Sequence, residues 1–143
     1  MASMVLVRDV MSKDVRVVRP DTTAQEIVAT MNKFNIGSVI VVQGERPVGI
    51  ITERDILMKL VEQCLAPQIL TARQLMTSPL ITIDETASVE EAARLMAKKR
   101  IKKLPVIDND KLVGIMTFTD IAFNVPTMLS LLEELARPYH RNY

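Results

Sequence analysis

Two threonine–aspartate pairs stand at matching places in this chain and could perform the same chemistry twice. The chain reads GIITERDI and, 65 residues later, GIMTFTDI, so Thr52 precedes Asp55 and Thr117 precedes Asp120 by three residues. A carboxylate can accept hydrogen bonds from two adjacent hydroxyls, such as those of a ribose. The same spacing also suits a capping box, which closes the first turn of a helix. The residues alone leave both interpretations open.

The two pairs belong to an internal repeat. At an offset of 65 residues and without a gap, residues 8–57 are identical to residues 73–122 at 13 of 50 positions, where ordinary composition gives roughly three. Because every loop keeps its length, we expect both copies to share one fold. Each copy reads as β-α-β-β-α, and its first helix begins with a capping box. These capping boxes are Thr23 with Glu26 and Ser88 with Glu91.

The composition predicts an aliphatic core and no strong electrostatic field. Hydrophobic residues make up 48% of the 143 residues, aromatic residues only 3%, and the formal net charge is +1. The one basic run, residues 98–103, has no aromatic residue beside it, so nucleic acid is not an expected partner. Cys64 cannot form an internal disulfide and is expected to be buried on a helix. No apolar run approaches the roughly 18 residues of a membrane span, so we expect a cytoplasmic protein and no membrane contact.

No pattern predicts catalysis. His140 has no cysteine, serine or carboxylate constellation around it in sequence, and neither a Walker loop nor a zinc-ligand spacing occurs. We therefore expect a protein that is not an enzyme, with no metal and no catalytic cofactor.

Two longer segments resemble a known family. RLMAKKRIKKLPVIDNDKLVGIMTFTDI resembles the signature half of a cystathionine-β-synthase (CBS) domain, and MNKFNIGSVIVVQGERPVGIITERDI resembles its partner copy. The resemblance covers residues 5–125 and implies a mixed α/β fold of the α+β type, with two tandem CBS repeats packed as a pseudo-twofold Bateman module. The implied domains are residues 1–70 (first repeat, N-terminal segment and linker helix), 71–126 (second repeat) and 127–143 (C-terminal helix and tail).

The resemblance also implies a function. Such modules commonly bind AMP, ADP, ATP or S-adenosylmethionine in clefts between their repeats, and they signal by conformational or oligomeric change. The expected partners are therefore an adenosine-containing small molecule, a second copy of the chain and an effector protein that the sequence does not identify. The alternative is a protein-interaction module that binds no ligand, in which Asp55 and Asp120 serve only as helix caps.

Carried over to this sequence, the resemblance implies a ligand site in each copy. In the second copy Thr117 and Asp120 would contact ribose and phosphate, and the basic residues before the strand would meet phosphates. The expected ligand-binding residues of the second copy are Thr82, Ile101, Lys102, Lys103, Leu104, Pro105, Gly114, Ile115, Thr117, Thr119 and Asp120. Those of the first copy are Val18, Ile36, Gly37, Ser38, Val39, Gly49, Ile50, Thr52, Arg54 and Asp55.

The two expected sites differ in charge. Lys102 and Lys103 of the second copy replace Gly37 and Ser38 of the first, so the second site should prefer a phosphorylated ligand. The first site would bind weakly, take an adenosine-like group, or stay empty. Solvated lysines that protect a strand edge are the alternative reading of the charged pair.

Two glycines and an apolar surface complete the expectations. Gly49 and Gly114 lie inside apolar strands, which indicates either a close approach by a ligand or backbone, or a bulge at a strand end. Apolar residues of the later helices are expected to form a homodimer surface. The expected dimer residues are Ile56, Leu57, Leu60, Val61, Ile121, Ala122 and the C-terminal run MLSLLEEL.

Overall fold

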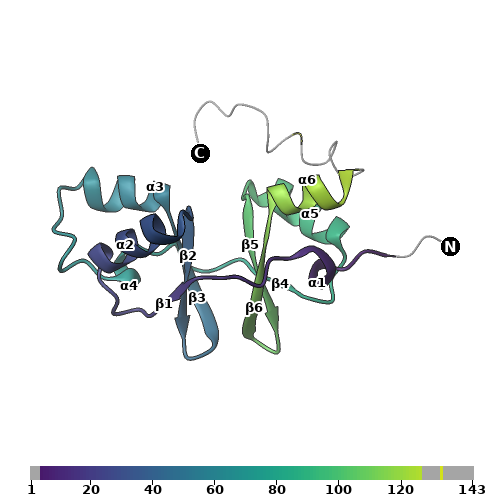
Figure 1. Ribbon diagram of the computed structural model, residues 1–143, viewed down its shortest axis with the longest axis horizontal. Helices are drawn as coiled ribbons and strands as arrows, with labels where there is room; N and C mark the ends of the chain where they lie inside the picture. The colour runs from purple at the N-terminus through teal and green to yellow at the C-terminus, as the bar shows by residue number, and fades with distance from the viewer. Residues whose placement is uncertain (1–3, 127–132, 134–143) are drawn as a thin grey trace. The chain divides into compact units, whose positions relative to one another are not determined.

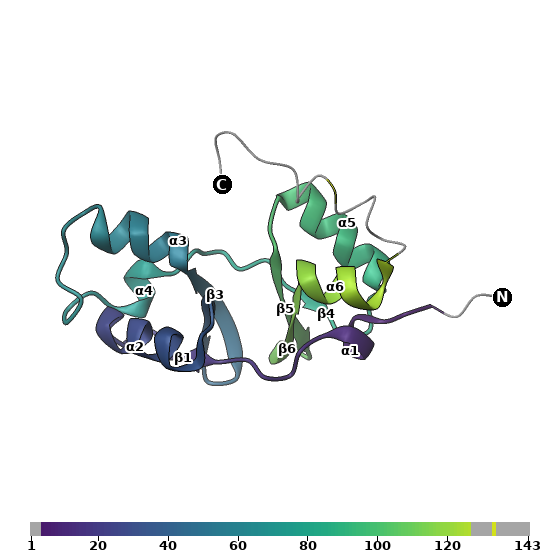
Figure 2. The ribbon, with the colours of Figure 1, turned by 45° about the horizontal axis from the view of Figure 1, so that its top comes forward.

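A computed structural model describes residues 4–126 and Glu133 of the chain. These residues form two compact units, each built around a three-stranded sheet (Figures 1 and 2). We call residues 15–80 the first-repeat unit, and residues 4–14 together with residues 81–126 the second-repeat unit. The expected C-terminal helix lies outside the described residues, Glu133 excepted. The mixed α/β fold class is confirmed.

The first-repeat unit has the sheet order β1-β2-β3, with β1 parallel to β2 and β2 antiparallel to β3. Its helices bury Ile27, Met31 and Leu75 against the strand residues Val39 and Ile51. Its elements are β1 (Val17–Val18), α2 (Ala24–Phe34), β2 (Ser38–Gln43), β3 (Arg46–Thr52), α3 (Glu53–Ile56), the π-helical turn η1 (Leu57–Val61) and α4 (Ala72–Leu75).

The second-repeat unit repeats this arrangement. Its sheet has the order β4-β5-β6, and α5 and α6 lie beside it (Figure 1). The core contains Met96 from α5, Ile121 from α6, and Leu104 and Met116 from the strands, all fully buried. Its elements are α1 (Val7–Val10), β4 (Ile83–Asp84), α5 (Val89–Lys99), β5 (Lys103–Asp108), β6 (Lys111–Thr117) and α6 (Phe118–Asn124).

The helix starts follow the predicted N-caps. The hydroxyl of Thr23 accepts from the amide of Glu26 at 3.3 Å, and that of Ser88 accepts from the amide of Glu91 at 3.0 Å. Each hydroxyl satisfies an amide that has no partner inside the helix. The equivalent helices α2 and α5 thus begin at the same position of each repeat.

Each unit is completed by a segment that is distant in sequence from its repeat. Ser12 forms a bridge with Ile115 on β6, with both N–H···O distances at 2.9 Å. Thr77 makes the same bridge with Ile50 on β3, at 2.8 and 3.3 Å. Residues 4–14 therefore pack with the second repeat and residues 71–80 with the first. The compact units thus group the chain differently from domains divided at residue 70.

Gly49 and Gly114 lie where these segments approach the strands. A Cβ atom on Gly114 would lie 2.8 Å from the Ser12 carbonyl oxygen, and one on Gly49 would lie 2.9 Å from Cβ of Met76. Both glycines also stand beside a register shift in the strand pairing. Each glycine therefore has both a close contact and a neighbouring bulge, and the group that approaches it is a segment of this chain.

Three expectations about apolar side chains were wrong. Cys64 is exposed, because the helix ends before it and its φ is 55°. Leu60 and Ile121 are only 6% and 0% exposed and belong to the cores of their own units, so neither is available to a dimer surface. Leu57 and Val61, at 57% and 59%, are exposed. Among the described residues, no helix combines the length and apolar character that crossing a membrane requires.

Substituting the two glycines tests these close contacts. Gly49→Ala and Gly114→Ala should each lower the free energy of unfolding by about 1–3 kcal/mol, because the added methyl group overpacks the strand. Adding Met76→Ala should recover part of the loss at Gly49, where the contacts are all with a side chain. Adding Met11→Ala should recover less at Gly114, where the Ser12 carbonyl remains. Urea unfolding of the four variants measures the difference; equal recovery at both glycines would contradict it.

Candidate functional site

Both threonine–aspartate pairs form the predicted capping box. The Thr117 hydroxyl accepts from the amide of Asp120 at 3.1 Å, and the Thr117 amide donates to Asp120 Oδ2 at 3.0 Å. In the first repeat the corresponding distances between Thr52 and Asp55 are 3.3 and 2.8 Å. The cap interpretation is therefore confirmed in both copies. The capping box uses Oδ2 of each carboxylate, so the partners of Oδ1 have to be described separately.

In the first repeat the carboxylate of Asp55 is buried, with 7% of the residue exposed, and four donors surround it. The amide and hydroxyl of Thr52 donate to Oδ2 at 2.8 and 3.1 Å. The Thr77 hydroxyl donates to Oδ1 at 2.9 Å, and the ammonium group of Lys59 lies 3.1 Å from the same oxygen. A carboxylate has about four acceptor positions. The Asp55 carboxylate therefore has no capacity left for a diol.

Lys59 is held in place by backbone as well as by Asp55. Its Nζ donates to the carbonyl of Leu75 at 2.9 Å and to that of Met76 at 3.3 Å, both at the end of α4. Together with the ion pair to Asp55, these contacts engage all three donors of the ammonium group. The pair is thus part of a closed hydrogen-bond network that joins α3, η1 and α4.

In the second repeat the equivalent carboxylate remains accessible. Among the described residues, Asp120 accepts a side-chain hydrogen bond only from the Thr117 amide, and its side chain is partly buried. Asn124 takes the place of Lys59 and donates instead to the backbone carbonyl of Asp120 at 2.8 Å. Ser12 takes the place of Thr77, and its hydroxyl accepts from the Asp14 amide at 3.4 Å. The residues that the structure describes therefore leave most of the Asp120 acceptor capacity unused.

Several predicted residues gather where β6 leads into α6. The amide of Phe118 donates to the carbonyl of Lys102 at 2.9 Å, which joins the loop after α5 to the start of α6. Lys103 pairs with Thr117 across the two strands. Thr119 is exposed in the first turn of α6. The structure thus brings threonine, lysine and aspartate residues to one end of the sheet.

The first repeat places the matching residues in the same way, with different chemistry. The amide of Glu53 donates to the carbonyl of Gly37 at 3.2 Å, and Ser38 pairs with Thr52. Arg54 is exposed on α3. No lysine occupies positions 37 and 38, so this end of the sheet lacks the basic pair of the second repeat.

The predicted apolar walls divide between two locations. Leu104, Val39 and Val18 belong to the buried cores of their units. Pro105 pairs with Ile115 on the neighbouring strands, one residue out of phase with the Leu104 position, so both point to the opposite face. Thr82 directly precedes β4, and Ile101 precedes Lys102. In the first repeat Ile36 matches Ile101 and Ile50 matches Ile115, and both are partly buried.

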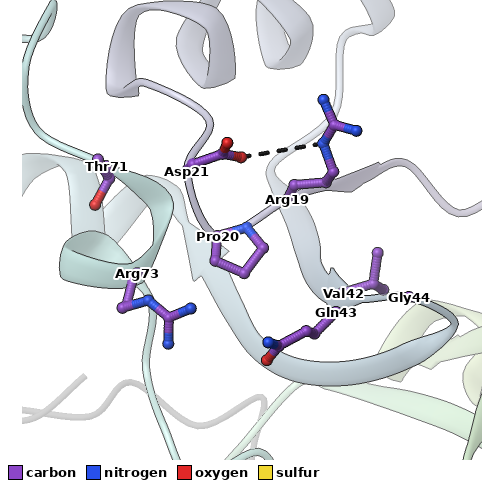
Figure 3. Close-up of a pocket in the computed structure, with 8 residues that line it drawn as sticks. All are labelled: Arg19, Pro20, Asp21, Val42, Gln43, Gly44, Thr71 and Arg73. Atoms are coloured by element: carbon purple, nitrogen blue, oxygen red, sulfur yellow. Dashed lines mark ion pairs between the residues drawn. The ribbon is translucent and has the colours of Figure 1, made fainter.

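A separate cavity of about 420 Å³ lies at the other end of the first-repeat sheet, near the β2–β3 turn (Figure 3). Arg73 and Gln43 line it, while Arg19 turns to Asp21, 4.0 Å from Nε to Oδ1. The side chains of Arg19 and Asp21 are 83% and 86% exposed, so this pair is solvated and weak. The cavity contains none of the predicted ligand-binding residues.

No group of three histidine, cysteine or acidic side chains that could hold a metal occurs in the part of the chain that the structure describes. One exposed carboxyl has a shifted pKa: the hydroxyl and amide of Thr86 donate to Asp84 and hold its pKa below the ordinary value. These hydrogen bonds stabilise the turn after β4.

Sequence reasoning missed Lys59 and Thr77, although signals for both were present. Lys59 follows Asp55 by four residues, the spacing of an ion pair on one helix face. Thr77 stands at the repeat position of Ser12. Their convergence on one carboxylate depends on how residues 71–80 pack against β3, which residue spacing does not reveal.

Comparison with known proteins gives one family for both repeats. The family model described as "CBS domain" matches residues 7–62 and 72–126. An uncharacterized protein of Methanopyrus kandleri is 42% identical over 132 residues, covering 91% of this chain and 67% of that protein. A CBS domain-containing protein of Bacillus subtilis is 32% identical over 136 residues, covering 95% and 96%.

Solved structures resemble the whole described fold. A CBS domain protein from Pyrobaculum aerophilum, complexed with AMP, superposes with a TM-score of 0.79 at 26% sequence identity. The match covers 90% of this chain and 99% of that one. The similarity therefore extends over both repeats and not only over the signature motifs.

The different environments of the two carboxylates predict different effects on stability. Asp55→Asn should lower the free energy of unfolding by about 2 kcal/mol, because it leaves Lys59 without its counter-charge. Asp120→Asn should cost less than about 1 kcal/mol, since an asparagine oxygen can still accept from the Thr117 amide. Urea unfolding of both variants measures this difference. Equal losses, or the larger loss at Asp120, would contradict the network described for Asp55.

Proposed function

We propose that this chain, which belongs to the CBS-domain family, is a regulatory module whose second repeat binds an adenosine-containing nucleotide through Asp120. In this proposal the nucleotide changes the conformation or assembly of the module, and the change is read by an effector protein. No catalytic step is involved.

The open carboxylate of Asp120 is the observation that carries the proposal. Within residues 4–126 one of its acceptor positions is used by the Thr117 amide, and the others can accept from the two adjacent hydroxyls of a ribose. A diol bound in this way would make two hydrogen bonds to a charged acceptor, which are among the stronger ones in proteins. The saturated carboxylate of Asp55 cannot accept both hydroxyls while its four donors remain.

The neighbours of Asp120 support a phosphorylated ligand. The hydroxyl of Thr119 and the ammonium groups of Lys102 and Lys103 belong to the segments that meet at the start of α6. Ammonium groups favour phosphate oxygens as point charges. The AMP complex of the Pyrobaculum aerophilum protein, which is similar over both repeats, supports the same ligand class for this chain.

Signalling would follow from a shift between populations. A ligand that binds one arrangement of the module better stabilises that arrangement by about 2.7 kcal/mol when its concentration is roughly 100 times its Kd. Association of two chains could report the shift. Leu57 and Val61, which remain exposed on the first-repeat unit, are the residues we propose for that contact.

Calorimetric titration with AMP, ADP, ATP and S-adenosylmethionine tests the proposed site. The wild type should bind at least one of them saturably, and Asp120→Asn should weaken that binding by about tenfold or more, as expected for the loss of hydrogen bonds to a charged group. Asp55→Asn, compared at a temperature where it remains folded, should bind as the wild type does.

Either of two results would overturn the proposal. Binding that is lost with Asp55→Asn and retained with Asp120→Asn would move the site to the first repeat. Protein confirmed free of ligand that gives no heat with any of the four compounds would favour an interaction module, in which both aspartates serve as helix caps.

The proposed phosphate contact predicts a dependence on charge. Lys102→Ala should weaken ATP binding by about twofold to fivefold and leave adenosine binding unchanged, because a partly solvated ion pair contributes up to about 1 kcal/mol. Raising the salt concentration should reduce the difference. Lys99→Ala, which removes an exposed cation from the end of α5, is the matched control. Equal losses with ATP and adenosine would exclude a phosphate contact at Lys102.

A further inference from the structure

We infer that Lys59 closes the first-repeat site, and that this one residue limits the chain to a single nucleotide. The inference rests on the proposed function, because it concerns which of two equivalent carboxylates a ribose can reach. The inference names the residue that blocks Asp55 and predicts that a lysine at the matching position, Asn124, would block Asp120 in the same way.

The closure follows from hydrogen-bonding capacity. Lys59 and Thr77 both contact Oδ1 of Asp55, the oxygen that the capping box leaves unused. The hydroxyl of Thr77 can rotate to make room for a ligand hydroxyl, whereas Lys59 is charged and held by two further carbonyls, so Lys59 is the donor that keeps a ribose out. The Lys59 side chain is 35% exposed and that of Asp55 only 10%, so displacing the ammonium group would break its ion pair with a buried carboxylate and leave two backbone carbonyls as its remaining protein partners. Lys59 therefore competes with ligand hydroxyls for the same atom.

The backbone explains why Lys59 stays in that position. The carbonyls of Leu75 and Met76 accept from the ammonium group as well as Asp55, so three acceptors hold it. Lys59 also lies within the π-helical turn η1, in which the amide of Glu62 donates to the carbonyl of Leu57 at 2.9 Å. Such turns often occur at functional positions of helices. The lysine is thus a fixed part of the unit.

We call the contact of Lys59 with Asp55 and the two carbonyls the lock. The second repeat keeps carbonyls at the matching positions, but it lacks the lysine, and α6 is α-helical where the first repeat has the π-helical turn η1. Val10 and Met11, at the end of α1, stand at the repeat positions of Leu75 and Met76, whose carbonyls hold Lys59. The bridge of Ser12 to β6 likewise matches the bridge of Thr77 to β3. Asn124 stands at the lysine position, but its side chain is shorter, uncharged and directed to the Asp120 carbonyl. A single substitution should therefore transfer the lock.

The experiment exchanges the two residues. Lys59→Asn gives the first repeat the residue of the second, and Asn124→Lys does the reverse, with Asn124→Gln as the uncharged control. Each is titrated calorimetrically with AMP and with adenosine, which carries no phosphate for an added lysine to attract. Thermal unfolding establishes that each variant is folded. Asn124 is exposed, so the test remains decisive if Lys59→Asn fails to fold.

We expect one AMP per chain for the wild type and two for Lys59→Asn. Asn124→Lys should weaken binding of AMP and adenosine about tenfold or more, and Asn124→Gln should leave both unchanged. Two AMP per wild-type chain would overturn the lock while leaving nucleotide binding intact. The lock would also be overturned if Lys59→Asn and Asn124→Lys both bound AMP with the stoichiometry and affinity of the wild type. Failure of both wild type and Lys59→Asn to bind any nucleotide would overturn the proposed function together with the lock.

Discussion

The whole arrangement depends on a segment that lies against the last strand of each sheet and is distant from it in sequence. The bridge of Ser12 to Ile115 and that of Thr77 to Ile50 extend the two sheets, and a glycine in each strand leaves room for the methionine beside the bridge. Because a Cβ atom at either glycine would overlap this segment, the glycines are needed for packing. In the first repeat this segment also carries Thr77, which donates to Asp55, and the carbonyls of Leu75 and Met76, which accept from Lys59.

The two repeats share one backbone arrangement but differ in the charge that lies beside the equivalent aspartate. In both, a threonine and an aspartate cap the helix that follows the third strand. One aspartate is neutralised by Lys59 within its own unit, whereas the other faces Asn124 and has capacity left. A buried ion pair adds little net stability, but it costs much if one partner is removed. The first repeat therefore resembles a structural copy of the site in the second.

This difference offers a physical route by which a tandem repeat divides its tasks. The repeat with the closed network has α3, η1 and α4 joined in one arrangement through one ammonium group. The repeat with the open carboxylate keeps hydrogen-bonding capacity that the described residues do not use. Binding energy available at one site alone is enough to shift a two-state equilibrium, provided that the two states differ in affinity.

The sequence by itself determined the repeat, the order of helices and strands, the N-caps and the family resemblance. These features depend on local spacing: a residue three positions before a helix amide, or an apolar residue every second or every third to fourth position. It also indicated that the two sites differ in charge, from Lys102 and Lys103 against Gly37 and Ser38.

Only the tertiary structure decided which aspartate is open. Asp55 is saturated by Thr77, 22 residues away, and by a lysine that the carbonyls of Leu75 and Met76 hold in place. Hydrogen-bond saturation depends on groups that meet in space, and here they come from a segment beyond the repeat. The structure also decided the exposure of Cys64. The apolar pattern placed Cys64 on a helix, but the helix ends before it.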